Sequence, residues 1–286
     1  MKTMVNAIML IIICIILCGG KAMEEGKIIL ELNTVMMRNT YKIEGEGSLG
    51  SCFLVGKPIK EQPGKARFIL VTANHVLEQI KGEEATIYLR KKSNDNSFIK
   101  IPWKIKIRQS NNDLWIKNKR GIDVAVLYVS LPKDIDYELI SYTNLASDKD
   151  LTEYEIHPGD EMYCLGFPFG TEANEAGFPI LRSGKVASYP LVPTMKNESF
   201  LLDFKVFKGN SGGPVYFVDT NRFYGGNFRF NKIQFIAGIV SKEFNITETI
   251  KALYETKQQI HPLSLAVIIH ASHIRETIDQ LPEAEK

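Results

Sequence analysis

The amino-acid sequence predicts an all-β fold, either a barrel or a sandwich. Short runs rich in Val, Ile, Phe and Tyr recur along most of the chain, and Gly, Pro, Asn or Asp bound them, which is the pattern of strands joined by turns. Helical patterns are scarce by comparison. The expected strands are Ser51–Gly56, Phe68–Thr72, Ala85–Leu89, Val124–Val129, Glu161–Leu165, Val215–Val218 and Phe235–Val240.

Alternation of apolar and basic residues predicts one further strand, and the sequence also predicts three helices. Apolar and basic residues alternate over Ile99–Arg108, which indicates a half-buried strand with a basic solvent face, and Pro102 places it at an edge or a bulge. A short helix should follow His75 and another should lie near Thr247–Gln258. A terminal helix should begin at Ser272, whose hydroxyl would cap it.

The composition excludes strong charge-driven binding. The chain has 286 residues, of which 44% are hydrophobic and 24% charged, with a formal net charge of only +2. That length allows two small cores. The segment Lys91–Arg120 is rich in basic residues, with Trp103 and Trp115 between them, and could suggest a nucleic-acid surface. Strand alternation already explains those charges as solvated faces, so no nucleic-acid partner is expected.

The first residues have the pattern of an export signal. Lys2 precedes the unbroken apolar run Ala7–Cys18, which is too short to span a bilayer as a helix but fits a secretory signal peptide over residues 1–22, cleaved after Ala22. An uncleaved anchor and a lipid anchor on Cys18 are the alternatives, although Leu17 does not suit the latter. The protein is therefore expected to be secreted, periplasmic or in the cell envelope, with membrane contact only through an uncleaved signal or lipid anchor.

Two cysteines remain after residue 22. Cys52 and Cys164 both lie in apolar strings, so two buried, reduced thiols are expected rather than a disulfide bridge.

The strongest chemical motif is the string Gly209-Asn210-Ser211-Gly212-Gly213-Pro214. Attack on a peptide carbonyl needs an exposed serine oxygen and two N–H donors where negative charge develops. Glycine at 209 lets the backbone turn its N–H inward, and the serine's own N–H would be the second donor. A purely structural turn is the alternative, but six such residues flanked by strands favour a nucleophile.

A base and an orienting acid are found upstream. His75 follows the hydrophobic strand that ends at Thr72, and imidazole titrates near neutrality, as a general base must. Asp123 stands at the mouth of the apolar run Val124–Leu127, where an unpartnered carboxylate would be costly. Asp113 is the competitor, but polar neighbours place it in a loop. A lone histidine would be structural; the serine string makes catalysis the better interpretation.

The three strings, in the order His, Asp, Ser, resemble the chymotrypsin-like serine proteases, and within them the bacterial HtrA-like and trypsin-like branch. Gly50–Val55 is similar to the strand before the histidine, Gly166–Gly170 to a turn of the HtrA-like branch, and Ala237–Ser241 to the strand that pairs with substrate. The resemblance covers the chain from about Thr34 to Glu276.

The resemblance implies two six-stranded β-barrels with the active site between them. The N-terminal barrel would cover residues 34–150 and carry the histidine and aspartate. The C-terminal barrel would cover 151–271 and carry the serine, and 272–286 would form a helix and tail. It also implies an oxyanion hole made by the N–H groups of Gly209 and Ser211, and a substrate-binding strand at Ser241, Lys242 and Glu243.

Several features depart from the family. Val76 stands where many animal members have a bridging cysteine, no activation sequence is visible, and no PDZ domain is expected after the second barrel. Proteases of this family have a pocket that holds the substrate side chain just before the cleaved bond. If the chain is aligned with the family without gaps, Lys205 would lie near the base of this pocket and Glu243 at its wall. Lysine there would disfavour Lys or Arg substrates, but one insertion would remove the argument.

The expected function is that of a serine endopeptidase that cleaves protein or peptide substrates and needs no cofactor. His270, His273 and Glu276 have a spacing that could bind a metal, but they straddle a strand–helix junction without supporting ligands, so no metal site is predicted. The alternative function is a latent or inactive binding module of protease fold in the cell envelope.

Overall fold

The computed structural model describes residues 31–59, 66–230, 232–251 and 255–282. The predicted signal peptide at 1–22 lies outside these residues. Within the described part of the chain, no helix is both long and apolar enough to cross a membrane.

The first sheet contains every strand predicted before residue 130. Its order is β5-β4-β1-β2-β3-β9-β8, and the short β10 pairs in parallel with β2. Strand β5 lies at the edge, as Pro102 predicts, and pairs with β4 along its length. The bounds are β1 Thr40–Gly45, β2 Ser48–Pro58, β3 Ala66–Thr72, β4 Glu84–Lys92, β5 Phe98–Lys106, β8 Ile116–Lys117, β9 Ala125–Tyr128 and β10 Ile140–Ser141; a small hairpin joins β6 (Arg108–Gln109) to β7 (Asn112–Asp113).

The second sheet has the six strands expected, in the order β12-β11-β14-β17-β18-β13. Neighbouring strands in it are antiparallel. The bounds are β11 Glu161–Gly166, β12 Ile180–Lys185, β13 Ser199–Leu202, β14 Pro214–Asp219, β17 Ile233–Lys251 and β18 Thr256–His270, with a side hairpin of β15 (Arg222–Tyr224) and β16 (Asn227–Arg229). The predicted all-β fold is confirmed, but the first sheet has eight strands where the resemblance implied six, and among the described residues the end strands of neither sheet pair to close a barrel.

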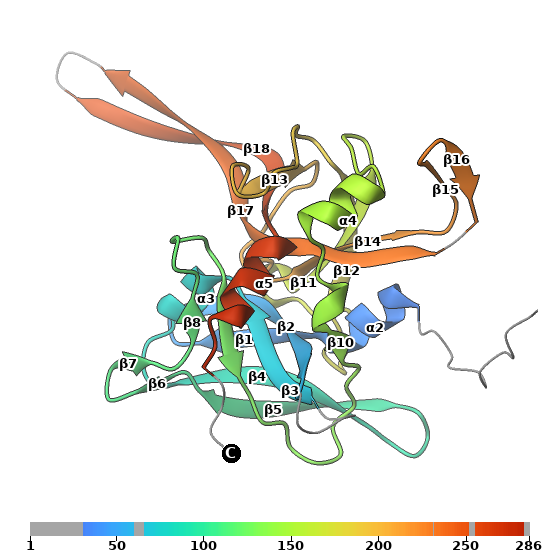
Figure 1. Ribbon diagram of the computed structural model, residues 1–286. Coiled ribbons are helices and arrows are strands. Elements are labelled where there is room, and N and C mark those ends of the chain that lie inside the picture. Colours follow the sequence, from blue (N-terminus) through green and yellow to red (C-terminus); the bar gives the residue numbers. More distant parts are fainter. Residues whose placement is uncertain (1–30, 60–65, 231, 252–254, 283–286) are drawn as a thin grey trace, which may run out of the picture. The chain divides into compact units, whose positions relative to one another are not determined.

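The helices are short: α2 precedes the first strand, α3 and α4 lie between strands, and α5 follows the last one (Figure 1). They are α2 Leu32–Asn39, α3 Asn74–Glu78, α4 Asp148–Glu153 and α5 Ala271–Asp279, with 3-10 turns at Tyr142–Asn144 and Pro168–Gly170. The helix after His75 and the terminal helix were predicted, whereas α2 was not. Ser272 does not cap α5, because the chain enters the helix at His270 and the Ser272 hydroxyl instead hydrogen-bonds Thr194 Oγ1 at 2.9 Å.

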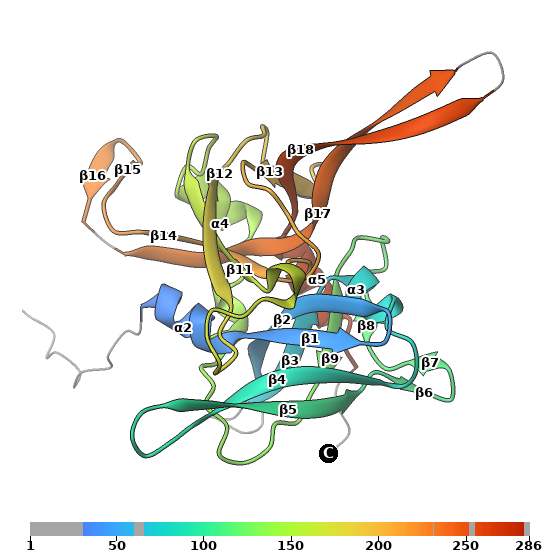
Figure 2. The ribbon, with the colours of Figure 1, turned by 180° about the vertical axis from the view of Figure 1, so that it is seen from behind.

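The prediction of a helix near Thr247–Gln258 is wrong. Of these residues, 247–251 belong to β17 and 256–258 to β18. The two strands pair from Asn245↔Pro262 to Lys251↔Thr256 and extend past the other strands of the second sheet (Figure 2). The local sequence has helix-forming residues at helical spacing, but cross-strand pairing decides the structure, and a local pattern does not reveal such pairing.

Both predicted thiols are confirmed as free and buried. Cys52 hydrogen-bonds weakly to the Tyr41 carbonyl, and burial raises the pKa of each thiol, that of Cys164 to about 12. Neither thiol is therefore a nucleophile at neutral pH.

Candidate active site

His75 and Asp123 are joined by two hydrogen bonds. Asp123 Oδ1 accepts from the backbone N–H of His75 at 3.0 Å, and Oδ2 lies 2.8 Å from the imidazole Nδ1. Because an ionised carboxylate can only accept, it selects the tautomer with the proton on Nδ1 and leaves Nε2 able to act as a base. The His75 side chain is 33% exposed, so a substrate can reach the ring.

The short helix α3 places His75 and is held at both ends. The indole of Trp115 donates to the Asn74 side chain at 3.0 Å, next to His75. The guanidinium of Arg108 stacks on the Trp115 ring and donates to the Leu77 carbonyl at 3.0 Å and to the Ile80 carbonyl at 2.6 Å. A cation at a helix C-terminus satisfies carbonyls that have no partner inside the helix.

Asp123 accepts a third hydrogen bond from Ser241. The Ser241 hydroxyl donates to Oδ2 at 2.5 Å. Burial alone would raise the pKa of Asp123, but the hydrogen bond and charge of His75, together with the Ser241 hydroxyl, hold that pKa below its ordinary value. Asp123 is therefore ionised at neutral pH, as an orienting carboxylate must be.

The Ser211 hydroxyl lies on the other side of Ser241. Its Oγ donates to the Ser241 carbonyl at 2.9 Å. A hydroxyl has one proton to donate, so in this structure the Ser211 proton is directed at that carbonyl and not at His75. Ser241 thus contacts Asp123 through its side chain and Ser211 through its backbone carbonyl.

The peptide between Lys208 and Gly209 has a fixed orientation. The Lys208 carbonyl accepts a hydrogen bond from the Phe169 N–H at 2.6 Å. The C=O and N–H of a trans peptide point in opposite directions, so the Gly209 N–H is directed away from Phe169. Gly209 has φ +97°, and a Cβ there would lie 2.1 Å from the Phe167 carbonyl oxygen. Only glycine fits, which gives the sequence motif its physical reason.

The turn that supplies the Phe169 N–H is held to the first sheet by ion pairs. Phe169 itself has φ 53°, within the Pro168–Gly170 turn. Just after the turn, Glu172 pairs with Lys42 at 2.7 Å and with Lys100 at 2.5 Å. Burial opposes ionisation of Glu172, but the two lysines hold its pKa below the ordinary value.

The fully buried Arg90 adds a second anchor for the same segment, because its guanidinium donates to the Gly177 carbonyl at 2.9 Å.

Ser51, on β2, holds the turn of residues 209–213, here called the nucleophile turn, against the first sheet. Its hydroxyl donates to the Gly209 carbonyl at 2.7 Å, and its N–H donates to the Ser211 carbonyl at 2.8 Å. Its own carbonyl accepts from the Thr72 hydroxyl at 2.7 Å. A Cβ on Gly212, which has φ +80°, would lie 2.2 Å from that carbonyl. The two sheets therefore meet directly beneath the serine.

Sequence reasoning selected His75, Asp123, Gly209 and Ser211 but missed the groups that hold them in place. Ser51 and Phe169 lie in strings that resembled family motifs, yet a sequence does not show which backbone group receives a hydrogen bond. Glu172 gave no signal at all, because its partners on β1 and β5 are distant in the chain.

The comparisons identify the family. A model of the trypsin-like peptidase domain matches residues 50–225, which is more than half of the chain. The chain belongs to the trypsin-like peptidase family. This confirms the resemblance seen in the sequence, and membership implies peptide substrates. No curated protein matches the chain.

Two solved structures are similar to this trypsin-like peptidase. One is the crystal structure of Rv3671c from M. tuberculosis H37Rv, a serine-to-alanine mutant in an inactive form; it is 14% identical, with 88% of this chain and 92% of that chain covered and a TM-score of 0.43. The other is the Rv3671c protease in an inactive form, 15% identical, with 87% and 91% covered and a TM-score of 0.41.

Of the predicted substrate-binding residues of the peptidase, Ser241 contacts Ser211 directly. Lys242 and Lys205 are exposed, and the Lys205 ammonium lies 5.5 Å from the centre of the Phe207 ring. Glu243 is half-buried, and its Oε1 is buried without a hydrogen-bond donor among the described residues. The effect of Lys205 on substrate choice stays a prediction.

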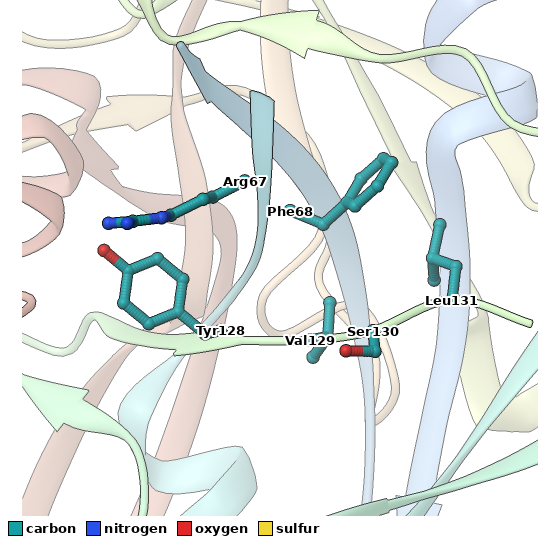
Figure 3. Close-up of a pocket in the computed structure, with 6 residues that line it drawn as sticks. All are labelled: Arg67, Phe68, Tyr128, Val129, Ser130 and Leu131. Atoms are coloured by element: carbon teal, nitrogen blue, oxygen red, sulfur yellow. The ribbon is translucent and has the colours of Figure 1, made fainter. Parts of the chain in front are cut away.

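Outside this site the peptidase has a surface pocket of about 430 Å³ beside β3 and β9 (Figure 3). It shares no residue with the triad or with the nucleophile turn. Its lining residues are Arg67, Phe68, Tyr128, Val129, Ser130 and Leu131.

The two histidines near the C-terminus are both buried. The His270 ring packs against Phe200 with 4.7 Å between ring centres, and His273 Nδ1 lies 3.4 Å from Glu276. Within the described residues, no group of three His, Cys, Asp or Glu side chains is arranged to hold a metal ion.

Proposed function

We propose that this chain is an active serine endopeptidase that hydrolyses peptide bonds through an acyl-enzyme. The observation that carries the proposal is the arrangement of Asp123, His75 and Ser211 around Ser241, together with the fixed orientation of the Lys208–Gly209 peptide. Each group needed for acyl transfer is supplied by this chain, and family membership supports the same reaction.

The reaction begins when the Ser211 side chain turns from the Ser241 carbonyl to His75 Nε2. His75 takes the hydroxyl proton as Oγ attacks the substrate carbonyl carbon, and Asp123 stabilises the imidazolium that forms. The N–H groups of Gly209 and Ser211 stabilise the negative charge on the carbonyl oxygen. His75 then protonates the leaving amine. Water, deprotonated by His75, hydrolyses the ester on Ser211 and restores the enzyme.

A second candidate function, a latent enzyme or a binding module of protease fold, is favoured by one observation. The Ser211 proton is directed at the Ser241 carbonyl and not at the imidazole. Such contacts are often loose in a free enzyme and tighten when substrate binds, so the active enzyme remains the better proposal.

We also propose that the protein is secreted or held in the cell envelope. The apolar run Ala7–Cys18 after Lys2 supports this, since it has the length and flanks of an export signal.

The test is covalent labelling of the purified protein, residues 23–286, with a fluorophosphonate, followed by mass spectrometry to locate the label. We expect label on Ser211 and none in a Ser211→Ala variant. A folded protein that stays unlabelled would contradict the proposal and favour the binding module.

A further inference from the structure

The side hairpin of β15 and β16 carries phenylalanine side chains on one face. Phe223 lies directly opposite Phe228 in the pairing of the two strands, so their side chains share a face. Phe230 follows just after β16, and its ring meets that of Phe228 edge to face with 4.9 Å between the ring centres. The three side chains are 63%, 54% and 84% exposed, in chain order. We call this surface the aromatic face and define it as Phe223, Phe228 and Phe230.

The opposite face of the hairpin is fixed to the rest of the peptidase by Arg222. This side chain is buried, and its guanidinium pairs with both carboxylate oxygens of Asp160, at 2.8 and 2.6 Å. It also donates to the carbonyls of Tyr154 and Glu155, each at 2.7 Å. The buried Tyr224 packs against the Tyr154 ring with 5.6 Å between the ring centres. The hairpin therefore cannot turn its phenylalanines inward without breaking these contacts.

This arrangement reverses the usual distribution of side chains in a surface hairpin. Globular proteins mostly bury phenylalanine and expose arginine, whereas here Arg222 is buried and the aromatic face is exposed. Three phenylalanines at these exposures present roughly 400 Å² of apolar area. A contiguous apolar patch of that extent on a monomer is often functional. A partner is therefore expected to cover the aromatic face.

Basic residues accompany the aromatic face along the chain. Arg229 stands between two of the phenylalanines and Lys232 follows them, and both are exposed. The chain has no Asp or Glu from residue 220 to residue 242. Of the acids beside the hairpin, Asp219 pairs with the same buried arginine, and Glu155 accepts from the N–H of the hairpin turn at 3.0 Å. An apolar surface flanked by cations is complementary to an anionic lipid surface.

The shape of the hairpin also favours a membrane over a protein partner. Both ribbon views show β15 and β16 standing away from the other strands of the chain (Figures 1 and 2). A projecting surface needs a matching groove on a protein, whereas the fluid interface of a bilayer adapts to it. A second copy of the chain fits less well, because two aromatic faces packed together would bury about 800 Å², below the roughly 1,200 Å² of a stable interface.

We propose that the aromatic face binds the surface of an anionic lipid bilayer. The phenylalanine rings enter the boundary between headgroups and acyl chains, and the side chains of Arg229 and Lys232 reach the headgroup phosphates. Three rings and two cations give reversible binding, far weaker than insertion of a spanning helix. The sequence predicted membrane contact only through the N-terminal segment, and the hairpin adds a contact that does not need that segment.

The experiment measures cosedimentation of the protein, residues 23–286, with lipid vesicles. These residues exclude the predicted signal peptide and contain the whole compact unit Leu32–Lys286. We expect vesicles of phosphatidylcholine mixed with phosphatidylglycerol to be bound at least about tenfold more tightly than vesicles of phosphatidylcholine alone. The double variant Phe228→Ser/Phe230→Ser should bind the mixed vesicles at least about tenfold more weakly than the parent. Urea unfolding of this variant shows that it stays folded.

The matched control is Ile250→Ser/Ile260→Ser, which removes two apolar side chains of β17 and β18 that are 44% and 64% exposed. It should bind the mixed vesicles like the parent. Equal weakening by the two double variants would overturn the proposal, and so would equal binding of the parent to both kinds of vesicle. A parent that binds no vesicles but self-associates in sedimentation equilibrium, through the phenylalanines, would overturn it and assign the aromatic face to a second copy of this chain.

This inference does not rest on the proposed function. Fluorophosphonate labelling of Ser211 tests the nucleophile in the absence of lipid, whereas cosedimentation tests the hairpin without any need for catalysis. Failure of either one is therefore distinguishable from failure of the other.

Discussion

Gly209→Ala tests whether the Lys208–Gly209 peptide supplies a donor for catalysis. The added Cβ would lie 2.1 Å from the Phe167 carbonyl oxygen and 3.1 Å from its carbon. Both atoms are backbone, so no flexible side chain can move aside, and the peptide itself must rotate. Rotation takes the Gly209 N–H away from the developing oxyanion, and loss of one such donor lowers kcat by roughly 10²- to 10³-fold.

The backbone penalty of alanine at positive φ must be separated from the clash. Gly159 has φ +95°, nearly the +97° of Gly209, but a Cβ there meets nothing within 4 Å. Gly159→Ala should therefore lose stability, on the order of 1 kcal/mol, and keep its turnover.

The assay is steady-state hydrolysis of p-nitrophenyl acetate, an ester small enough to be independent of the unknown side-chain specificity, with thermal unfolding of each variant recorded beside it. A Gly209→Ala turnover within twofold of Gly159→Ala would refute the assignment of the oxyanion donor.

Three further predictions concern the groups around the site and one buried histidine. Asp123→Asn should lower kcat roughly 10⁴-fold, the value known for the triad aspartate of a member of this family; unchanged esterase turnover would exclude Asp123 from the triad. Glu172→Gln should lower kcat about tenfold through misplacement of the Phe169 turn, with KM unchanged. The control Glu46→Gln removes an exposed ion pair with Lys81 and should leave kcat unchanged. Equal kcat values for the two variants would show that the turn does not need the Glu172 ion pairs. Burial lowers the pKa of His270 from 6.5 to about 4, so the unfolded chain binds its proton first. The free energy of unfolding should thus fall by roughly 3 kcal/mol as the pH drops from above 6.5 to about 4. Urea unfolding measured across this pH range should show that the His270→Phe variant lacks this decrease.

The sequence was sufficient for the parts of the fold that depend on local pattern. Strand patterns and turn residues predicted an all-β fold and most of its strands, and the family resemblance divided them into two halves. Pro102 indicated an edge or a bulge, and β5 lies at an edge, because proline cannot donate to a neighbouring strand. His75, Asp123 and Ser211 could be proposed as a triad because each stands next to a predicted strand in a recognisable string.

What the sequence did not predict depends on contacts between distant segments. The segments 247–251 and 256–258 were predicted as a helix, and the pairing of β17 with β18 makes them strands instead. In the same way, the orientation of the Gly209 N–H depends on a backbone bond from Phe169, and no side-chain pattern encodes such a bond. Helix α2 was missed because its sequence was read as the start of the strand region.

Because Ser51 hydrogen-bonds the turn that carries Ser211, the reactivity of Ser211 depends on how the two sheets are packed together. Ser51 belongs to the first sheet, yet it holds the carbonyls of Gly209 and Ser211 in the second. Mild denaturant or mechanical load that parts the sheets would release these carbonyls while each sheet keeps its own strands. Reactivity at Ser211 would then vanish before the circular dichroism of the strands changes, so inactivation and unfolding would have different midpoints.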